Sequence, residues 1–457
     1  MISDTGELLQ KMNLSSINMN GELKYFINKM ELVRIAFGER KLLIVFLLLI
    51  VICFHSCSDR ERLNPIDPQN PETGGRPQGL RVYSEYDQAT LRWLNIGLDS
   101  FEGYYIYRKT LGDTAFQLIY ITPPDSQVFI DKKLVYDQLY EYCITVKAED
   151  FESLPSDTVS ITPGPTFIWA TDVFLRYIFK LTHDCSSVIE RISVDGYPWA
   201  LSPVTDAGEF WYTDVFLNRV YGVDRLQNQR IIDYLDTGEP IDLAMDEYHN
   251  QVWVADETRG RILVYNIQGV KTGEFNGFSN PYSLDSYQSN GTCWISDIGV
   301  DKIFNINAYG DTNVEIDSLY RPKCVSVNQK NGDCWVADSS RVLVYDIDGG
   351  LKLTIDEGLI YPLNVAVDSE LGSCWVLDYS YFDFKSKLFC FSASGEKLVE
   401  LSGFTQPENL IVNPYDHSCI VADSGSGKIF KISRLGQVIG ESKNHAYPYG
   451  LVVEYVR

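Results

Sequence analysis

VWVAD, at Val252–Asp256, is one of seven similar stretches in the C-terminal two-thirds of this chain. The copies read IWATD from Ile168, FWYTD from Phe210, VWVAD from Val252, CWISD from Cys293, CWVAD from Cys334, CWVLD from Cys374 and CIVAD from Cys419. Their closing aspartates are 42, 42, 41, 41, 40 and 45 residues apart. A nearly constant period of this length indicates a repeated unit of several short strands, which is typical of a β-propeller.

The remainder of each unit supports strands rather than helices. After each aspartate comes a turn and a second alternating apolar run, such as RILVY at Arg261–Tyr265, then commonly a glycine turn and a third run. Each unit closes on a proline that begins a fourth strand; the prolines are Pro198, Pro240, Pro281, Pro322, Pro362, Pro407 and Pro448. Residues 448–456 have no aspartate strand after them, and Phe167–Asp172 has no proline strand before it. We therefore expect these two segments to pair, which closes a ring of seven sheets without an open edge.

The succession P-x-x-V-x-V, V-W-V-A-D, R-I-x-V-Y and glycine resembles the NHL-repeat propellers over residues 166–457. The resemblance implies an all-β, NHL-like β-propeller, and the seven repeats of about 42 residues predict that it has seven blades. Most NHL rings have six blades, so the count of seven departs from the usual pattern. That group includes protein-binding, glycan-binding and catalytic members, so the fold alone does not determine the activity.

A second domain is predicted upstream, at residues 77–162, where alternating runs such as TLRWLN and YCITVKAED lack the repeat. This segment resembles a fibronectin type III β-sandwich. The resemblance places Trp93 in the core and Tyr142 at the tyrosine corner, with its hydroxyl bonded to upstream backbone. The proline-containing step at residues 163–167 is short and stiff, which limits the orientations of the two domains.

The N-terminus points to export. Leu42–Phe54 is an apolar run of 13 residues that follows basic residues and precedes Cys57. It is short for a membrane span and resembles a bacterial lipoprotein signal peptide, which makes Cys57 the lipidation site. An uncleaved anchor or an ordinary signal peptide are the alternatives. We assign residues 1–57 to an N-terminal extension and signal peptide and residues 58–76 to a polar tether, and expect a lipid-anchored protein of the bacterial cell envelope, periplasmic or on the outer-membrane surface.

The net charge and the cysteines of the chain restrict its partners and its disulfides. The chain carries a formal net charge of −23, which argues against nucleic acid or anionic lipid as a partner. Most of its ten cysteines read as buried small apolar residues, because four of them occupy the repeat position where Val252 or Phe210 stands elsewhere. A disulfide between Cys324 and Cys334 across one hairpin is left open.

In a propeller the proline strand is innermost, so residues beside each proline lie at the mouth of a central channel. The predicted ligand-binding residues at this mouth are Tyr197, Trp199, Tyr282, Arg321, Lys323, Tyr361, Tyr447 and Tyr449. Aromatic rings together with charged groups suit a glycan or a peptide. We therefore predict a non-enzymatic protein without a cofactor that binds an envelope protein, a peptide or a glycan.

The alternative is a calcium-dependent hydrolase resembling gluconolactonase-type propellers, with an ion in the channel. Its predicted ligands are Asp242, Asp285, Asn364 and Asn409, since oxygen donors suit calcium. A lyase that depends on histidine and a metal is disfavoured, because the histidines are scattered over different repeat positions. The seven strand-end aspartates are interpreted as turn caps.

Overall fold

The computed structural model describes residues 63–148, 151–235, 238–380 and 385–455. The predicted signal segment and Cys57 lie outside these residues. The chain divides into two compact units, Met1–Gly75 and Arg76–Arg457. In the described part of the first unit, the Asn70 side chain caps a turn by accepting the backbone N–H groups of Glu72 and Thr73. Among the described residues, no helix has the length and apolar character needed to cross a membrane.

The second unit begins with two antiparallel sheets, which we call the N-terminal sheet pair. One sheet has the order β1 (Arg81–Glu85), β2 (Gln88–Arg92), β5 (Val128–Lys132). The other has the order β4 (Gln117–Thr122), β3 (Gly103–Thr110), β6 (Tyr140–Ala148), β7 (Phe151–Glu152), with β8 (Val159–Ile161) also paired to β6.

The predicted core residues of this sheet pair are buried: Trp93 is 5% exposed and Tyr142 is 0% exposed. The hydroxyl of Tyr142, however, donates to the Asp131 carboxylate (2.9 Å) rather than tying back to the backbone. It is Tyr140, two residues earlier, whose hydroxyl accepts a backbone N–H, that of Val135 (2.9 Å). The expected tie to upstream backbone therefore exists, but the prediction chose the wrong tyrosine, because two tyrosines share one face of the same strand.

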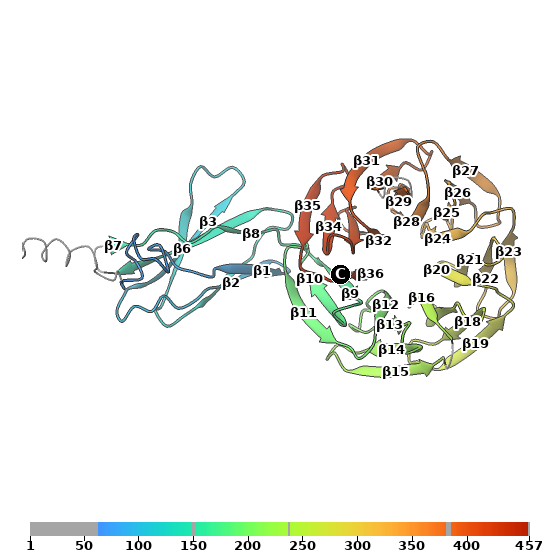
Figure 1. The fold of residues 1–457 in the computed structure, drawn as a ribbon, viewed down its shortest axis with the longest axis horizontal. Coiled ribbons are helices and arrows are strands. Elements are labelled where there is room, and N and C mark those ends of the chain that lie inside the picture. Colours follow the sequence, from blue (N-terminus) through green and yellow to red (C-terminus); the bar gives the residue numbers. More distant parts are fainter. Residues whose placement is uncertain (1–62, 149–150, 236–237, 381–384, 456–457) are drawn as a thin grey trace, which may run out of the picture. The chain divides into compact units, whose positions relative to one another are not determined.

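The rest of the unit, which we call the ring, is built from antiparallel sheets of four strands that follow one another around a centre (Figure 1). Seven such sheets occur in the described residues. In order from the inner to the outer strand, the first six consist of β12 (Pro198–Leu201), β13 (Phe210–Asp214), β14 (Arg219–Val223), β15 (Gln229–Tyr234); β16 (Pro240–Asp246), β17 (Gln251–Asp256), β18 (Arg261–Tyr265), β19 (Lys271–Asn276); β20 (Pro281–Tyr287), β21 (Thr292–Asp297), β22 (Lys302–Ile306), β23 (Thr312–Ile316); β24 (Pro322–Val327), β25 (Cys334–Asp338), β26 (Arg341–Tyr345), β27 (Leu351–Ile355); β28 (Pro362–Val367), β29 (Cys374–Ser380), β30 (Lys385–Phe391), β31 (Lys397–Phe404); and β32 (Pro407–Val412), β33 (Cys419–Asp423), β34 (Lys428–Ile432), β35 (Val438–Ser442). The proline strand is innermost in each, as the sequence predicts.

The remaining four-stranded sheet joins the two ends of the ring. Its order is β36 (Pro448–Tyr455), β9 (Thr166–Asp172), β10 (Tyr177–Leu181), β11 (Val188–Ser193). Strand β36 pairs with β9 in antiparallel register, with Val452 opposite Trp169. This confirms the predicted pairing of the C-terminal proline strand with the first aspartate strand, which hides an edge on each.

Apolar clusters between neighbouring sheets form the core of the ring. In six of these clusters the repeat tryptophan of one sheet lies with the residue that precedes the repeat tryptophan or isoleucine of the next sheet. These pairs are Trp169 with Phe210, Trp211 with Val252, Trp253 with Cys293, Trp294 with Cys334, Trp335 with Cys374 and Trp375 with Cys419. The four cysteines are free and 0% exposed, and burial raises the pKa of each thiol well above its usual value. They are therefore small apolar core residues, as predicted.

The possible Cys324–Cys334 disulfide is not formed. Both cysteines are free and buried, and their strands are registered so that Cys324 faces Ala337 while Cys334 faces Val327. The offset of three residues along the hairpin separates the two sulfur atoms.

The repeat aspartates are buried structural groups, and in six of the seven described four-stranded sheets they connect the two inner strands. Asp297 accepts the N–H groups of Ser279 (2.7 Å) and Asn280 (2.8 Å), just before the proline strand, and that of Gly299 (3.0 Å) in the following turn. Bonds to backbone before the proline recur at Asp172, Asp256, Asp338, Asp378 and Asp423. The sequence predicted the bonds to the following turn. The bonds to the backbone before the proline were not predicted; they hold the start of the proline strand against the aspartate strand, and we call them the clamp.

Candidate functional site in the central cavity

A cavity of about 380 Å³ lies at the centre of the ring. Its wall is formed by residues of the inner strands β12, β16, β20, β24, β28, β32 and β36, which converge on this point (Figure 1). All four predicted calcium ligands, Asp242, Asp285, Asn364 and Asn409, line it. Of the predicted mouth residues, Tyr282, Lys323 and Tyr449 line it as well.

Polar side chains of the wall connect neighbouring sheets. Each inner strand is the edge of its sheet, so its channel-facing N–H groups have no partner strand. The preceding sheet supplies acceptors: Asp242 Oδ2 accepts Leu284 N–H (2.8 Å), and Asp285 Oδ2 accepts Val327 N–H (2.7 Å). Further along the wall, hydroxyl oxygens take the same role; Ser283 Oγ accepts Val325 N–H (3.3 Å) and Ser326 Oγ accepts Val367 N–H (3.2 Å).

The two channel aspartates lie in an environment that favours their neutral forms. Burial raises the pKa of Asp242 to about 7, although its bonds to Leu284 and Leu243 N–H act in the opposite direction. Burial likewise raises the pKa of Asp285 to about 7, again opposed by the Val327 amide and reinforced by the nearby Asp242. These carboxyl groups therefore change charge near neutral pH.

The remaining predicted calcium ligands are bonded to each other. Asn364 Nδ2 donates to Asn409 Oδ1 (3.0 Å), and Asn364 Oδ1 accepts a contact from the Cys324 thiol (3.4 Å). Asn409 Oδ1 also accepts Leu410 N–H (2.8 Å). Carboxylate and amide oxygens are suitable calcium ligands. Here, however, several of these oxygens already accept hydrogen bonds from backbone or side-chain N–H groups, which an ion would have to share.

An aromatic residue and a cation meet at one side of the mouth. Lys323 Nζ lies 4.7 Å from the centroid of the Tyr282 ring, within the range of a cation–π contact. Burial lowers the Lys323 pKa, and the nearby Arg321 adds to this, while Glu257 opposes it. Burial also raises the pKa of Tyr282 to about 12. Lys323 is thus a half-buried ammonium without an ion pair among the described residues.

A second aromatic pair lies across the mouth. The rings of Trp199 and Tyr449 have centroids 3.9 Å apart at an interplanar angle of 32°. Trp199 Nε1 is buried and has no hydrogen-bond partner within the described residues. The Nε1–H groups of Trp253 and Trp294, inside the clusters between sheets, likewise have no partner within the described residues. The free Nε1–H of Trp199 differs from them because Trp199 packs on Tyr449, which lines the cavity.

A carboxylate completes the mouth. Glu408 lines the cavity, and its Oε1 accepts hydrogen bonds from the side chains of Gln406 (2.6 Å), Ser424 (3.0 Å) and Tyr447 (2.7 Å). Three donors on one oxygen hold this carboxylate in place. Glu408 was not among the predicted site residues, although it directly follows Pro407 and so occupies the same repeat position as Tyr282 and Lys323.

Five of the eight predicted mouth residues do not line the cavity: Tyr197, Trp199, Arg321, Tyr361 and Tyr447. Tyr197 packs edge-to-face on Phe216, with ring centroids 4.9 Å apart. Arg321 is exposed and has a positive φ of 53°, and its backbone N–H donates to Asp301 Oδ1 (2.7 Å). Tyr361 is half-buried, and its backbone N–H donates to Asp378 (2.7 Å). No residue just before one of these prolines lines the cavity, whereas the residue just after the proline lines it in six of the seven described sheets, Trp199 being the exception.

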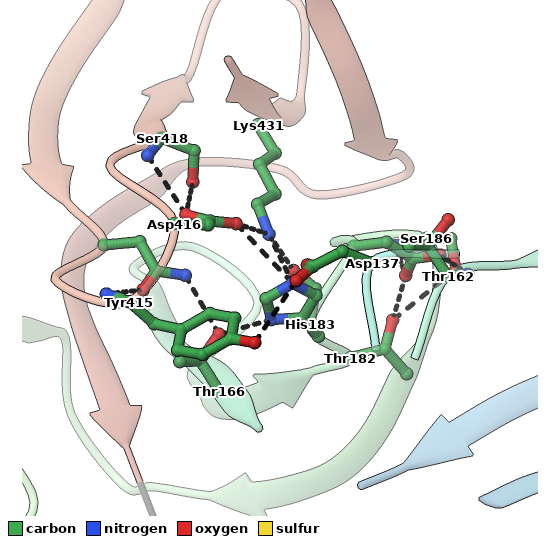
Figure 2. Close-up of polar contacts among 12 residues, drawn as sticks. Asp137, Thr162, Thr166, Thr182, His183, Ser186, Tyr415, Asp416, Ser418 and Lys431 are labelled. Atoms are coloured by element: carbon green, nitrogen blue, oxygen red, sulfur yellow. Dashed lines mark hydrogen bonds and ion pairs between the residues drawn. The ribbon is translucent and has the colours of Figure 1, made fainter. Parts of the chain in front are cut away.

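A separate polar cluster lies where the loop between β5 and β6 meets the ring (Figure 2). His183 is 2% exposed, and its Nε2 lies 3.2 Å from Asp137 Oδ1 and 3.5 Å from Asp416 Oδ2. These three residues have the geometry of a metal-binding group, and no other group of three acids, histidines or cysteines in the described residues does. Figure 2 shows Lys431 reaching into the cluster, with its Nζ 2.6 Å from Asp416 Oδ2 and 3.1 Å from His183 Nε2. A lysine ammonium therefore occupies the cation position, and we interpret the cluster as a structural latch.

The comparisons with known proteins support the fold and leave the activity open. No protein-family model matches the chain, and a search of curated proteins found no similar sequence. A functionally unknown protein from Desulfotomaculum acetoxidans is similar in structure, with a TM-score of 0.53 at 14% identity over 64% of this chain and 99% of that protein. A streptogramin B lyase gives a TM-score of 0.49 at 14% identity, covering 62% of this chain and 90% of the lyase. At this identity the similarity shows the fold alone, an all-β, β-propeller-like architecture.

Proposed function

We propose that this chain is a cell-envelope lipoprotein in which a fibronectin type III domain at residues 77–162 precedes a seven-bladed NHL-like propeller at residues 166–457. The seven four-stranded sheets and the β36–β9 pairing support the blade count. The two antiparallel sheets with buried Trp93 and Tyr142 support the upstream domain. The apolar run before Cys57 supports lipidation at that residue and a location in the envelope.

We further propose that the protein acts by binding, and that the mouth of the central cavity holds part of an envelope protein, a peptide or a glycan. The observation that carries this proposal is one cavity with aromatic rings at Tyr282 and Tyr449, a cation at Lys323 and a fixed carboxylate at Glu408. Rings can cover the apolar face of a sugar or side chain, while the two charges orient its polar groups. A volume of about 380 Å³ admits a sugar or a side chain rather than a folded domain.

The test is a screen of glycan and short-peptide arrays with the full chain, repeated with Tyr449→Ala. A matched control is Tyr309→Ala, since Tyr309 is 87% exposed in a turn at the outer part of the ring. We expect bound ligands to be lost with Tyr449→Ala and kept with Tyr309→Ala, both variants having melting temperatures near that of the parent. Ligands that bind both variants equally would place the binding surface elsewhere and contradict the proposal.

The calcium-dependent hydrolase is the second candidate, because all four predicted ligands line one cavity. It is tested by the melting temperature of the chelator-treated full chain with and without millimolar calcium. A ligand at about 100 times its dissociation constant stabilises the native state by about 2.7 kcal/mol. A rise specific to calcium that disappears in Asp242→Ala or Asn364→Ala would favour the hydrolase, and we expect no such rise.

A further inference from the structure

A second cavity, of about 650 Å³, lies between the first sheet of the N-terminal pair and the ring. Strands β1 and β2 supply Arg81 and Arg92 to its lining, strand β11 supplies Arg191, and the segment after β35 supplies Lys443. We call it the junction cavity. It is separate from the central cavity and shares no lining residue with it.

The charge of the junction cavity is opposite to that of the chain. Four basic side chains line it against one acidic side chain, Glu441, in a chain whose net charge is −23. Glu441 is already shared between Lys443 (2.5 Å) and Lys428 (3.0 Å). Its negative charge therefore does not neutralise the three arginines.

The arginines have unused hydrogen-bonding capacity. Within the described residues, neither Arg81 nor Arg191 takes part in an ion pair or a side-chain hydrogen bond. Arg92 donates from Nε to the Tyr83 hydroxyl (3.3 Å) and makes no ion pair. Each guanidinium offers five N–H donors in a planar fork that matches the oxygens of phosphate, and several such forks around one cavity can bind a multivalent anion.

The walls of this cavity are fixed to one another. The hairpin between β10 and β11 provides Ser187, whose hydroxyl donates to the backbone oxygen of Val82 in β1 (3.3 Å). The same hairpin carries His183 of the latch, which contacts Asp137 from the N-terminal sheet pair (Figure 2). On the other side, Gly440 of β35 lies so close to this hairpin that a Cβ there would overlap the backbone oxygen of Asp184. The three arginines are thus mounted on strands β1, β2 and β11, whose spacing is held without a ligand, which lowers the cost of binding.

We propose that the junction cavity binds a small ligand carrying two or more phosphate groups. Three arginines and a lysine against one shared carboxylate leave an excess of positive charge that such a ligand would neutralise. A small open pocket with four basic side chains in a strongly acidic protein does not suit a nucleic acid, which needs an extended basic surface. The ligand is therefore either a free phosphorylated compound or the phosphorylated headgroup of a lipid.

Inorganic pyrophosphate is the probe for the site, titrated calorimetrically into the full chain at low and at moderate salt. The test variant is Arg81→Ala/Arg191→Ala, and the control is Arg434→Ala, an exposed arginine in the turn before β35 and outside the cavity. A charge-assisted hydrogen bond contributes about 1.5–3 kcal/mol, so we expect the double variant to weaken binding at least about tenfold while the control leaves it unchanged. Absence of binding by the parent chain, or equal binding by all three proteins, would overturn the proposal.

The two sources of phosphate are separated with vesicles. The full chain is sedimented with phosphatidylcholine vesicles that contain or lack cardiolipin, whose headgroup carries two phosphate groups, and the readout is the difference in bound protein between the two, because the N-terminal apolar run contributes equally to both. A difference that depends on Arg81 and Arg191 identifies a lipid headgroup. Binding of pyrophosphate without such a difference identifies a soluble ligand.

Discussion

At the scale of single residues, many polar side chains in the ring interior accept hydrogen bonds from backbone N–H groups. The repeat aspartates and the channel residues Asp242, Asp285, Ser283 and Ser326 accept N–H groups that the strand pairing leaves over. Their positions follow from geometry: a strand at the edge of a sheet has one row of amides that needs acceptors.

Replacing Asp256 by alanine should destabilise the protein more than replacing Asp214. Asp256 is 0% exposed and accepts Glu239 N–H (3.0 Å) and Arg261 Nε–H (2.7 Å), so its loss leaves a part-buried amide without an acceptor and leaves Arg261 with Glu274 as its remaining carboxylate. Asp214 caps only the following turn, through the N–H groups of Phe216 and Leu217. We expect Asp256→Ala to cost about 3 kcal/mol and Asp214→Ala about 1 kcal/mol. Urea unfolding measures both, and equal losses would disprove the clamp.

The channel aspartates should make stability depend on pH in a defined direction. Their folded pKa of about 7 lies above the unfolded value of about 3.9. Between these values the folded protein holds protons that the unfolded chain has released, so stability falls as the pH rises through this window and levels off above pH 7. In Asp242→Asn/Asp285→Asn the fall between about pH 5 and 8 should be smaller by about 2–4 kcal/mol, seen as a difference from the parent in urea midpoints. Identical pH profiles would show that the two groups stay charged.

At the level of single residues, the sequence predicted the burial of the repeat cysteines, Trp93 and Tyr142, because exchange with apolar residues and strand alternation both report on the core. All four predicted calcium ligands line one cavity, since the proline positions define the innermost strands, but only Tyr282, Lys323 and Tyr449 of the eight predicted mouth residues do. Those that directly precede a proline fell outside it, because that position belongs to the turn that the repeat aspartate holds in six of the sheets; they are Tyr197, Arg321, Tyr361 and Tyr447. The latch had no local signal, as Asp137, His183, Asp416 and Lys431 come from distant segments.

At the scale of strands and sheets, the closing strand β36 completes the sheet that holds the first strands of the ring. Leu451 in β36 is 5% exposed and packs in one cluster with Ile168 of β9 and Ile420 of β33. The period-2 alternation, the prolines and the aspartates were sufficient to predict the pairing of the ends. They were insufficient to predict which tyrosine of β6 accepts a hydrogen bond from the backbone, because the choice depends on the conformation of the loop before β6.

Leu451→Ala should destabilise the whole ring by about 2–5 kcal/mol, because it opens a cavity between the first and last sheets. Tyr455→Ala is the control in the same strand, since Tyr455 is 41% exposed, and should cost less than about 1 kcal/mol. Urea unfolding followed by tryptophan fluorescence measures both. If Leu451→Ala cost no more than Tyr455→Ala, β36 would contribute little to closure.

At the scale of the whole molecule, the N-terminal sheet pair and the ring meet at the latch and at the junction cavity. Lys431 is 2% exposed and holds Asp416 and the backbone oxygen of His183 (2.8 Å). Because the Lys431 ammonium is buried next to the Asp416 carboxylate, removing either group leaves a buried charge without its counter-ion. The loss of one partner should therefore lower the stability of the protein strongly.

Lys431→Met should cost about 3–5 kcal/mol, because it leaves Asp416 without its cation. Lys397→Met, which breaks the exposed pair with Glu400, should cost less than about 1 kcal/mol. Differential scanning calorimetry on both variants checks this, and a separate low-temperature transition in Lys431→Met would show the N-terminal sheet pair unfolding apart from the ring. A melting curve identical to that of Lys397→Met would disprove the structural role of the latch.

The central claim is that the mouth of the central cavity binds a ligand through its aromatic rings and its charged groups. The most direct measurement is calorimetric titration of the strongest array ligand into the full chain and into two lysine variants. Lys323 contacts Tyr282 at the mouth, whereas Lys330 lies just past the far end of the same inner strand and pairs with Glu370 on the surface. The account predicts that Lys323→Ala weakens binding at least about tenfold and that Lys330→Ala leaves it unchanged. Equal affinity of both variants for the ligand would contradict it.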